Sequence, residues 1–393
     1  MPAGPDYDHY KPDEFGRLAV LYRHAFGIGE GRVRHYIDSI GDGNFRVVHR
    51  AGVLVGAVAL LDMGHWFGGK LVPCRGIAAV AVEPAERGRG TATRMMAAAV
   101  EETRADGFPI SSLYPATLPL YQRVGYAKAG DRITYRLPLT VLRGLRPDPL
   151  LERADNPADR TTIVRLQSER ARRTNGLLER CNLLWERAIG SPERLCSTWF
   201  IPGADGPEGY VTVGVRSDHD RTLHLHDWAV LNPRAGRALL AFLGGWHSQV
   251  SAITWAGGPE DTLIHLLPEV GASIASWEQW MIRITDVAGA LTARGWPPGL
   301  TLGLTLSVTD PLLAANNGRF RLEVAAGQAT VERVGSAGAA DLTLGVDALA
   351  TLYTGHLAPR VMADLGMIEA TPAGLAAAGM LFAGPRPWLA DTF

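Results

Sequence analysis

The stretch "GIAAVAVEPAERGRGTATRMMAAAV", residues 76–100, predicts a buried strand, a glycine-rich turn and a helix in immediate succession. Residues 76–82 are continuously apolar, which is typical of a strand with both faces covered. After Gly90, apolar residues recur at helical spacing on one face. These apolar residues are Ala92, Met95, Met96, Ala99 and Val100. Residues 87–90 therefore occupy a strand-to-helix turn.

This turn has the composition of an anion-binding site. Gly88 and Gly90 can adopt positive φ and let a ligand approach the backbone closely. Successive exposed N–H groups and the helix dipole favour negative charge at such a turn, and Arg87 and Arg89 add positive charge. These parts suit a pyrophosphate. The alternative is a glycine-rich turn with solvated arginines.

Three phosphate-binding motifs are candidates for the turn. A P-loop needs Gly-Lys-Ser/Thr, which is absent here, and the dinucleotide motif G-x-G-x-x-G needs glycine where Thr93 stands. Residues 87–92 match every fixed position of [RQ]-x-x-G-x-[GA], and so resemble the acetyl-CoA turn of the GNAT acetyltransferases. The resemblance implies that the Val80 and Val82 backbones lie beside the pantetheine. It places around the pyrophosphate Arg87, Gly88, Arg89, Gly90, Thr91 and Ala92.

A second motif, "LYQRVGY", follows at residues 120–126. It resembles the L-Y-x-x-x-G-[FY] of GNAT proteins, whose tyrosine points at the sulfur of CoA. The resemblance implies that Tyr121 protonates the departing thiolate while the acetyl group passes directly to the acceptor. A phenol has an unperturbed pKa of about 10, so it carries the needed proton at neutral pH. A core aromatic residue with a satisfied hydroxyl is the alternative, and we expect Tyr126 to be a packing residue.

Composition limits the possible classes of protein. The chain has 393 residues, of which 47% are hydrophobic and 20% charged, so a sizeable core is possible. The formal net charge of −1 argues against a general nucleic-acid binder. The sequence contains no apolar run of about 18 residues and no signal-peptide core, so we expect no membrane span. Cys74, Cys181 and Cys196 lack metal or disulfide spacing, which favours a cytoplasmic setting.

The pattern of elements divides the chain into three units, at 1–137, 138–285 and 286–393. The first is an α/β unit. In the second, residues 223–247 repeat the order strand, proline, Arg-x-Gly and helix, but with one glycine where the first unit has two. We interpret the second unit as a degenerate GNAT-like domain. In the first unit we expect strands at 45–50, 53–62, 72–83, 109–114 and 131–138, and helices at 13–26 and 90–106.

The third unit has an α+β pattern. Residues 306–324, "LSVTDPLLAANNGRFRLEV", and residues 341–356, "DLTLGVDALATLYTGH", resemble sterol carrier protein folds. Two GNAT-like units followed by such a domain resemble the Eis (enhanced intracellular survival) family of acetyltransferases over essentially the whole chain. The resemblance implies acetyl-CoA-dependent N-acetylation of primary amines, often those of aminoglycosides, and a homo-hexamer.

The resemblance also assigns a role to Phe393. In the Eis family the terminal carboxylate enters the active site of the first domain, and this chain ends in phenylalanine as the family's members do. A carboxylate there would bind the substrate amine and accept its proton, because an ammonium has no lone pair until it is deprotonated. A frayed tail is the alternative, although Trp388, Leu389 and Phe393 are unusual tail residues.

The substrate is less clearly indicated. Thr392 stands where some aminoglycoside-active members have an acid, and Glu30 is the single acid of residues 25–32. Fewer acids attract a polycation less strongly, so a less charged amine is expected, with Glu30, Trp66 and Phe67 as substrate-binding residues. An aminoglycoside or another amine-bearing antibiotic fits this description. A protein lysine or peptide is an alternative acceptor, and a lipid or sterol carrier is an alternative to an enzyme.

No metal site is expected. His224 and His226 lie on one face of a predicted strand, because side chains alternate along a strand. No third imidazole is close to them in that strand. A half-exposed strand face therefore explains the two histidines.

Overall fold

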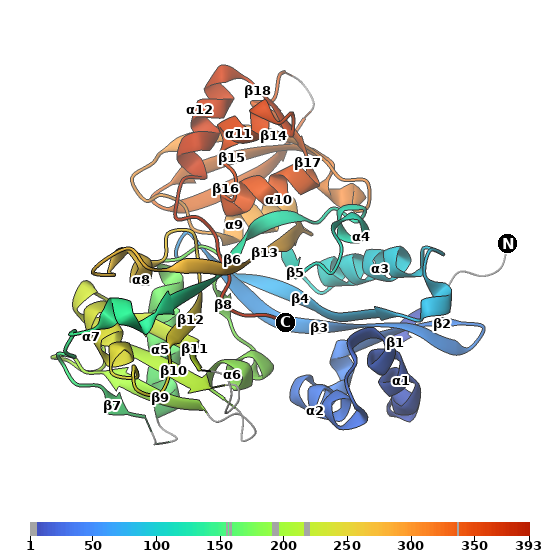
Figure 1. Cartoon of the computed structure of the whole chain (residues 1–393). Helices are drawn as coiled ribbons and strands as arrows, with labels where there is room; N and C mark the ends of the chain where they lie inside the picture. Colours follow the sequence, from blue (N-terminus) through green and yellow to red (C-terminus); the bar gives the residue numbers. More distant parts are fainter. Residues whose placement is uncertain (1–5, 155, 157–158, 191–195, 216–220, 336–337) are drawn as a thin grey trace.

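The computed structural model describes residues 6–154, 156, 159–190, 196–215, 221–335 and 338–393. In Figure 1 the first unit is blue to teal, the second is green to yellow, and the third, in orange and red, stands above both. None of the helices in these described ranges is both long enough and apolar enough to cross a lipid bilayer.

The first unit contains the predicted strands and helices, and the predicted buried strand and the helix after it are both confirmed. The strand predicted at 53–62 extends to Phe67, and the helix α2 was not predicted, since only Val33 and Ile37 of it are buried. The elements are β1 (Asp6–His9), α1 (Phe15–Phe26), α2 (Glu30–Ile40), β2 (Phe45–Arg50), β3 (Val53–Phe67), β4 (Lys70–Val82), α3 (Thr91–Ala105), β5 (Ile110–Leu113), α4 (Leu118–Gln122) and β6 (Ala127–Pro138).

β4 is covered on both faces, as its continuous apolar sequence predicts. Ala78 and Ala81 belong to a core cluster with residues of α1 on one face of the sheet. Ile77 belongs to a separate cluster on the other face, together with Met95 and Met96 of α3. The amphipathic face of α3 is therefore buried against the strand that leads into it.

The second unit contains the expected strand, turn and helix as β11 and α7. The Asn232 side chain caps α7 by accepting a hydrogen bond from the N–H of Ala235. Its elements are β7 (Glu152–Arg153), α5 (Asp159–Arg172), β8 (Leu178–Glu179), α6 (Asn182–Ile189), β9 (Cys196–Ile201), β10 (Gly209–Val215), β11 (Thr222–Val230), α7 (Pro233–Gly244), β12 (Ala252–Gly257), α8 (Thr262–His265) and β13 (Ser273–Ile284).

The first two units share one sheet and exchange strands within it. Counted over the described residues it has thirteen strands, in the order β1-β2-β3-β4-β5-β13-β6-β12-β11-β10-β9-β7, with β8 paired to β3. β13 of the second unit pairs with β5, where Ile284 lies opposite Ile110. β6 of the first unit pairs with β12, where Ile133 lies opposite Gly257. The boundaries at 137 and 285 stay predictions, because strands cross between the units there.

The third unit has its own sheet and docks on the first two through helices. Five strands of the described residues form this sheet, in the order β16-β15-β14-β17-β18. The helix α10 lies against β6 and β13, and α9 lies against β4. The elements are α9 (Val287–Ala293), β14 (Leu302–Thr309), β15 (Gly318–Ala325), β16 (Gln328–Val334), β17 (Leu342–Gly345), α10 (Val346–Thr354), α11 (Pro359–Asp364), β18 (Ile368–Ala370) and α12 (Pro372–Leu381).

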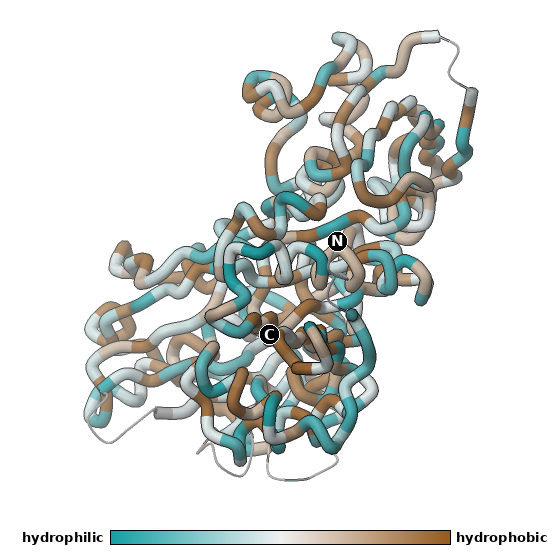
Figure 2. Tube along the Cα trace, turned by 90° about the vertical axis from the view of Figure 1, so that its right-hand side faces the viewer, coloured by the Kyte–Doolittle hydropathy of each residue, from teal (hydrophilic) through white to brown (hydrophobic). Residues whose placement is uncertain are grey.

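Residues 385–393, which we call the C-terminal strap, run back from the third unit to the other two. Figures 1 and 2 both show the C terminus over the body of the first two units. The Leu389 N–H donates to the Asp131 carbonyl at 3.0 Å, and the Trp388 N–H donates to the Asn175 carbonyl at 3.0 Å. The strap is therefore bonded along its length to β6 and to the segment that follows α5.

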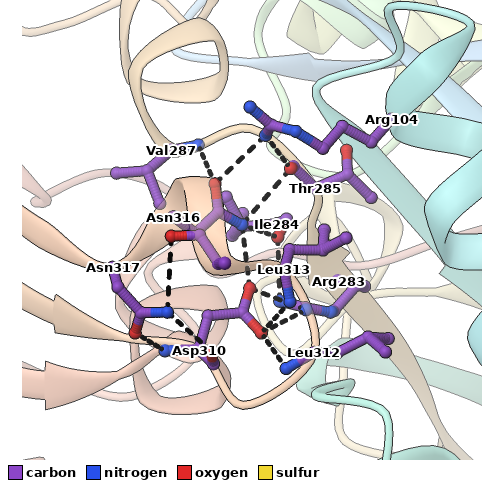
Figure 3. Close-up of polar contacts among 11 residues, drawn as sticks. Arg104, Arg283, Ile284, Thr285, Val287, Asp310, Leu312, Leu313, Asn316 and Asn317 are labelled. Carbon is purple, nitrogen blue, oxygen red and sulfur yellow. Dashed lines mark hydrogen bonds and ion pairs between the residues drawn. The ribbon is translucent and has the colours of Figure 1, made fainter.

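A buried ion pair joins the third unit to β13 (Figure 3). The Nη2 of Arg283 donates to both carboxylate oxygens of Asp310 at 2.7 Å, and neither side chain is exposed. Asp310 also accepts hydrogen bonds from the Asn316 amide at 2.8 Å and from the Leu312 backbone N–H at 3.0 Å. Such pairs need these additional bonds, because the removal of two charges from water is costly.

We expect Asp310→Ala to destabilise the chain by about 3–5 kcal/mol, because it leaves the Arg283 charge buried without its partner. Urea unfolding followed by circular dichroism measures this change. The matched control is Asp364→Ala, which removes an exposed ion pair with Arg360 (3.0 Å) in the same unit and should change stability by less than about 0.5 kcal/mol. An Asp310→Ala protein as stable as this control would contradict the role of the pair.

Candidate active site

The turn between β4 and α3 is open to ligands. Gly88 has a φ of 75° and Gly90 has a φ of 78°, both in the left-handed region that favours glycine. A Cβ at Gly88 would have no atom within 4 Å. Residues 87–90 are all exposed, and the helix begins at Thr91 with no side-chain cap on its first turn. The backbone N–H groups here can therefore face an anion, as the sequence predicts.

A buried carboxylate supports the turn through ion pairs with two arginines. Glu86 is 9% exposed, and its Oε2 lies 2.8 Å from the Nε of Arg50 on β2. The same glutamate reaches the exposed Arg89, with Oε1 at 3.5 Å from Nη1. The exposed Arg94 donates to the Arg89 carbonyl at 3.1 Å and adds a third guanidinium beside the turn. Sequence reasoning missed Glu86, Arg50 and Arg94; only Arg94, in the first turn of α3, could have been found from its position.

The pairing of β4 with β5 ends well before this turn. Their parallel pairing ends at Gly76 and Ser112, although β4 continues to Val82. β4 also carries a β-bulge, since two residues of β4 oppose one residue of β3 and Ala79 has a φ of 49°. β5 itself ends at Leu113, so the last residues of β4, including Val80 and Val82, border an unpaired stretch of the sheet, which we call the β4–β5 opening.

Tyr121 lies on the α3 face of this opening. Its side chain is 4% exposed and belongs to the cluster that contains Ile77 of β4 and Leu113 of β5, with Val80 packed against it. Burial raises the pKa of Tyr121 to about 12. The phenol therefore keeps its proton at neutral pH, which a general acid requires.

Tyr126 has a different environment from Tyr121. It is fully buried, and its hydroxyl lies 2.7 Å from the Ser111 hydroxyl. Its ring packs edge-on against Tyr121, with centroids 6.1 Å apart. These contacts are those of a packing residue.

The strap brings Phe393 to the other face of the same opening. The Phe393 ring packs edge-on against Tyr114, the residue that follows β5, with centroids 5.9 Å apart. Phe393 and Ala79 both pack against the cluster on the α1 face of the sheet. Arg187 donates to the Thr392 carbonyl at 2.8 Å and holds the last peptide in place. The end of the chain is thus tied down rather than frayed.

The structure separates the proposed substrate residues. Glu30 is exposed at the start of α2 and pairs with Arg23 at 3.0 Å. Trp66 is 7% exposed and packs in a small cluster with Trp388 of the strap. Phe67 has no exposure and packs on Tyr353 of α10, with centroids 5.2 Å apart. Phe67 is therefore a core residue shared with the third unit rather than a residue of the opening.

Two polar groups near the opening need explanation. Within the described ranges the buried Tyr114 hydroxyl has no hydrogen-bond partner, so a ligand in the opening could satisfy it. The Asp391 side chain is 7% exposed and accepts from the Arg180 Nε at 2.8 Å. Burial raises the pKa of Asp391. Because Asp391 is bound to Arg180, it does not replace the acidic residue that some aminoglycoside-active members of the family have at the position of Thr392.

His224 of β11 is hydrogen-bonded to the neighbouring strand β12. The His224 Nδ1 lies 2.7 Å from the Thr254 hydroxyl, which accounts for one ring nitrogen. Over the described ranges of the chain, no group of three or more His, Cys, Asp or Glu side chains is arranged to hold a metal ion.

Comparison with known proteins identifies the family. Family models match an acetyltransferase (GNAT) domain at residues 6–129, another at 176–284, and a sterol carrier protein domain at 287–390. An uncharacterized N-acetyltransferase of Streptomyces griseus is 32% identical over 358 residues, covering 83% of this chain and 83% of that protein. The N-acetyltransferase Eis of Mycobacterium tuberculosis is 27% identical over 333 residues, covering 77% of this chain and 76% of that protein. This chain belongs to the Eis family of GNAT N-acetyltransferases.

A solved structure supports the arrangement of this Eis-family chain. The GCN5-related N-acetyltransferase from Anabaena variabilis is 34% identical and superposes with a TM-score of 0.93, covering 99% of this chain and 100% of that one. The Eis-family chain is thus an acetyltransferase with two GNAT domains and a sterol carrier protein domain. Its GNAT domains imply the use of acetyl-CoA, and the open turn and the β4–β5 opening fit that coenzyme.

We expect Gly90→Val to weaken acetyl-CoA binding at least about tenfold, because it places a branched side chain at positive φ in the turn. Isothermal titration calorimetry measures the affinity. Gly107→Val is the matched control, since Gly107 also has positive φ (82°) and open space around it, but lies at the other end of α3. Equal affinities in the two variants would refute the assignment of the turn.

Proposed function

We propose that this Eis-family enzyme transfers the acetyl group of acetyl-CoA directly to a primary amine of a small molecule in the first unit. The observation that carries the proposal is that Tyr121 packs with Ile77 and Leu113 on one face of the sheet, while Phe393 packs against Tyr114 and the cluster on the other face. The exposed turn at residues 87–90 lies at the end of β4, where it can hold the pyrophosphate. The opening beside β4 then receives the rest of the coenzyme.

The two groups have complementary roles in the proposed mechanism. The terminal carboxylate of Phe393 accepts a proton from the substrate ammonium, either directly or through water, and so exposes the nitrogen lone pair. The Tyr121 phenol donates its proton to the departing thiolate. The contact of Phe393 with Tyr114 and the Arg187 bond to Thr392 orient the carboxylate, which limits the entropy cost of the step.

The acceptor is proposed to carry modest positive charge. Arg23 offsets the Glu30 charge, and Arg180 binds Asp391, so neither acid is free to attract a polycation. An aminoglycoside or another amine-bearing antibiotic remains within the proposed class, with Trp66 as a wall residue. The apolar side chains of α10 are buried in the core of the third unit, which favours a packing role for them over lipid carriage.

An amine panel tests this function against its alternatives. Thiol release from acetyl-CoA is followed with aminoglycosides, monoamines, a lysine peptide and a buffer blank, and a fluorescent-lipid displacement assay runs in parallel. Turnover with small amines supports the proposal. Turnover with the lysine peptide alone would point to a protein acetyltransferase. Lipid displacement without any turnover would point to a carrier.

A hexamer in the cytoplasm is also proposed, on the basis of the family resemblance. The N-terminal half of β13 is exposed, with Ile274 at 55% and Trp277 at 59% exposure. Apolar exposure of this size on a strand is typical of a surface that another chain covers. Light scattering measures the assembled mass directly.

We expect Tyr121→Phe to lower kcat about 10²–10⁴-fold, the usual contribution of a general acid, with acetyl-CoA affinity nearly unchanged. Steady-state kinetics on the best amine and calorimetry give the two quantities. The matched control is Tyr126→Phe, which loses the hydrogen bond to Ser111 and about 0.5–1.5 kcal/mol of stability but keeps its turnover. Wild-type turnover in Tyr121→Phe would remove Tyr121 from the mechanism.

We expect a C-terminal tag to reduce kcat/KM at least about 100-fold, because a peptide carbonyl then replaces the Phe393 carboxylate. Deletion of Phe393, which moves the carboxylate by about 3.5 Å of chain, should have a similar effect. An N-terminal tag is the control, and melting curves exclude unfolding as the cause. Full activity in the C-terminally tagged enzyme would contradict the role of the Phe393 carboxylate and would mean that solvent accepts the proton of the substrate ammonium.

A further inference from the structure

The second unit contains a cavity of about 320 Å³ that the proposed reaction does not use. It lies between the end of β11, the start of α7, the segment after β12 and the C-terminal strap. Trp228 and Val230 line it from β11, and Pro385 and Trp388 line it from the strap. A cavity of this volume matches the lower range of small-molecule sites.

The cavity occupies the same place in the second unit as the β4–β5 opening does in the first. The parallel pairing of β11 with β12 ends at Leu225 and Trp255, although β11 continues to Val230. The last residues of β11 therefore lack a partner on the β12 side, as the last residues of β4 do on the β5 side. The degenerate domain has kept its opening between strands.

Acetyl-CoA does not fit this second opening in the same way. The turn before α7 has no counterpart of Gly88 and Gly90, because Asn232 caps the helix directly. A Cβ at Gly236 would lie 2.3 Å from the Leu266 side chain, so that position is filled by packing. A pyrophosphate has no open nest here, and a ligand of this cavity must be smaller than the coenzyme.

Arg170 lines the cavity and carries a donor that no described residue uses. Its guanidinium is stacked between Trp228 and Trp388, with its carbon 3.5 Å and 4.9 Å from the two ring centroids. Its Nη1 donates to the Trp228 carbonyl, but over the described residues its buried Nη2 has no hydrogen-bond partner. Arg170 is only 9% exposed. A buried charged donor without a partner is costly, so an acceptor in the cavity would be bound favourably.

The remaining charges of the cavity favour an anion. Arg173 and Arg386 line it beside Arg170. Of the two acids in its wall, Asp261 uses Oδ1 to accept from the Leu263 N–H at 3.0 Å and from the Trp255 indole at 3.1 Å, while over the described residues its buried Oδ2 has no hydrogen-bond partner. Glu260 is exposed. Arginine side chains with free donors recognise carboxylates through paired hydrogen bonds.

We propose that this cavity binds a small organic carboxylate with an apolar body. The carboxylate pairs with the free Nη2 of Arg170, and the body lies against Trp228, Trp388 and the aliphatic side chains around them. The indoles and the aliphatic wall favour an organic acid over inorganic phosphate. Since the strap forms one wall, the ligand also holds the strap in its bonded position.

Benzoate is the probe, added to the full-length protein and followed by calorimetry. Benzamide, which lacks the charge, and inorganic phosphate, which lacks the apolar body, are the comparison probes. We expect saturable benzoate binding, with benzamide and phosphate at least about tenfold weaker. Hydrogen exchange measured with and without benzoate should slow at the Trp388 and Leu389 amides, which bond the strap to its neighbours.

Variants locate the bound probe. Arg170→Met and Arg173→Gln should each weaken benzoate binding about 10–100-fold, as expected for hydrogen bonds to a charged group. Thr262→Trp places a bulky side chain at an exposed position of the cavity wall and should abolish binding. It tests the same site independently, in case Arg170→Met does not fold. The matched control, Arg172→Gln, lies next to Arg173 but outside the cavity wall and should bind normally.

Several results would overturn the proposal. They are the absence of benzoate binding at millimolar concentration, phosphate binding as tight as that of benzoate, and normal binding in Thr262→Trp. Loss of benzoate binding in Gly90→Val but not in Arg173→Gln would also overturn it, because it would assign the probe to the first unit. The proposal does not depend on acetyl transfer, so an inactive but benzoate-binding protein leaves it intact.

Discussion

The guanidinium of Arg283 stands at the point where the three units meet, and the surrounding backbone is shaped around it. It pairs with Asp310 of the third unit, while its own strand, β13, completes the sheet of the first unit. A Cβ at Gly125 would lie 2.8 Å from its Nε and 3.1 Å from the Val346 side chain. The glycine four residues after Tyr121 is therefore required by packing, and the helix that carries Tyr121 is positioned by the third unit.

The features predictable from the sequence are those with a local signal. The buried strand at 76–82 and α3 follow from continuous and periodic apolar residues, and the two positive-φ glycines follow from the turn between them. The exchange of β6 and β13 has no such signal, because the alternation of apolar and polar residues along a strand is the same whichever strand it pairs with. Pairing partners distant in the sequence are decided by tertiary packing rather than by propensity.

The candidate site also has features that the sequence predicts and features that it does not. The turn and Tyr121 could be recognised from short motifs. The Arg50–Glu86 pair that supports the turn could not, because no local sequence pattern predicts that these two segments lie close together. Phe67 stays a prediction as a substrate residue, although its packing on Tyr353 favours a core role, because an aromatic residue at the end of a strand has the same sequence signal in a core and in a pocket. Asp391 is close to the terminus in the sequence, but Arg180, which also binds Asp227 at 2.6 Å, forms an ion pair with it at 2.8 Å.

The strand exchange also imposes an order on synthesis and folding. β5 lacks its neighbour until β13 has left the ribosome, so the first GNAT domain cannot close its sheet while most of the second is still being made. The nascent chain exposes an unpaired strand edge during that interval, and such edges are prone to aggregate. Contacts between distant segments such as Ile110 and Ile284 also slow folding. The two acetyltransferase domains are therefore expected to fold as one cooperative body after translation of β13, rather than one after the other.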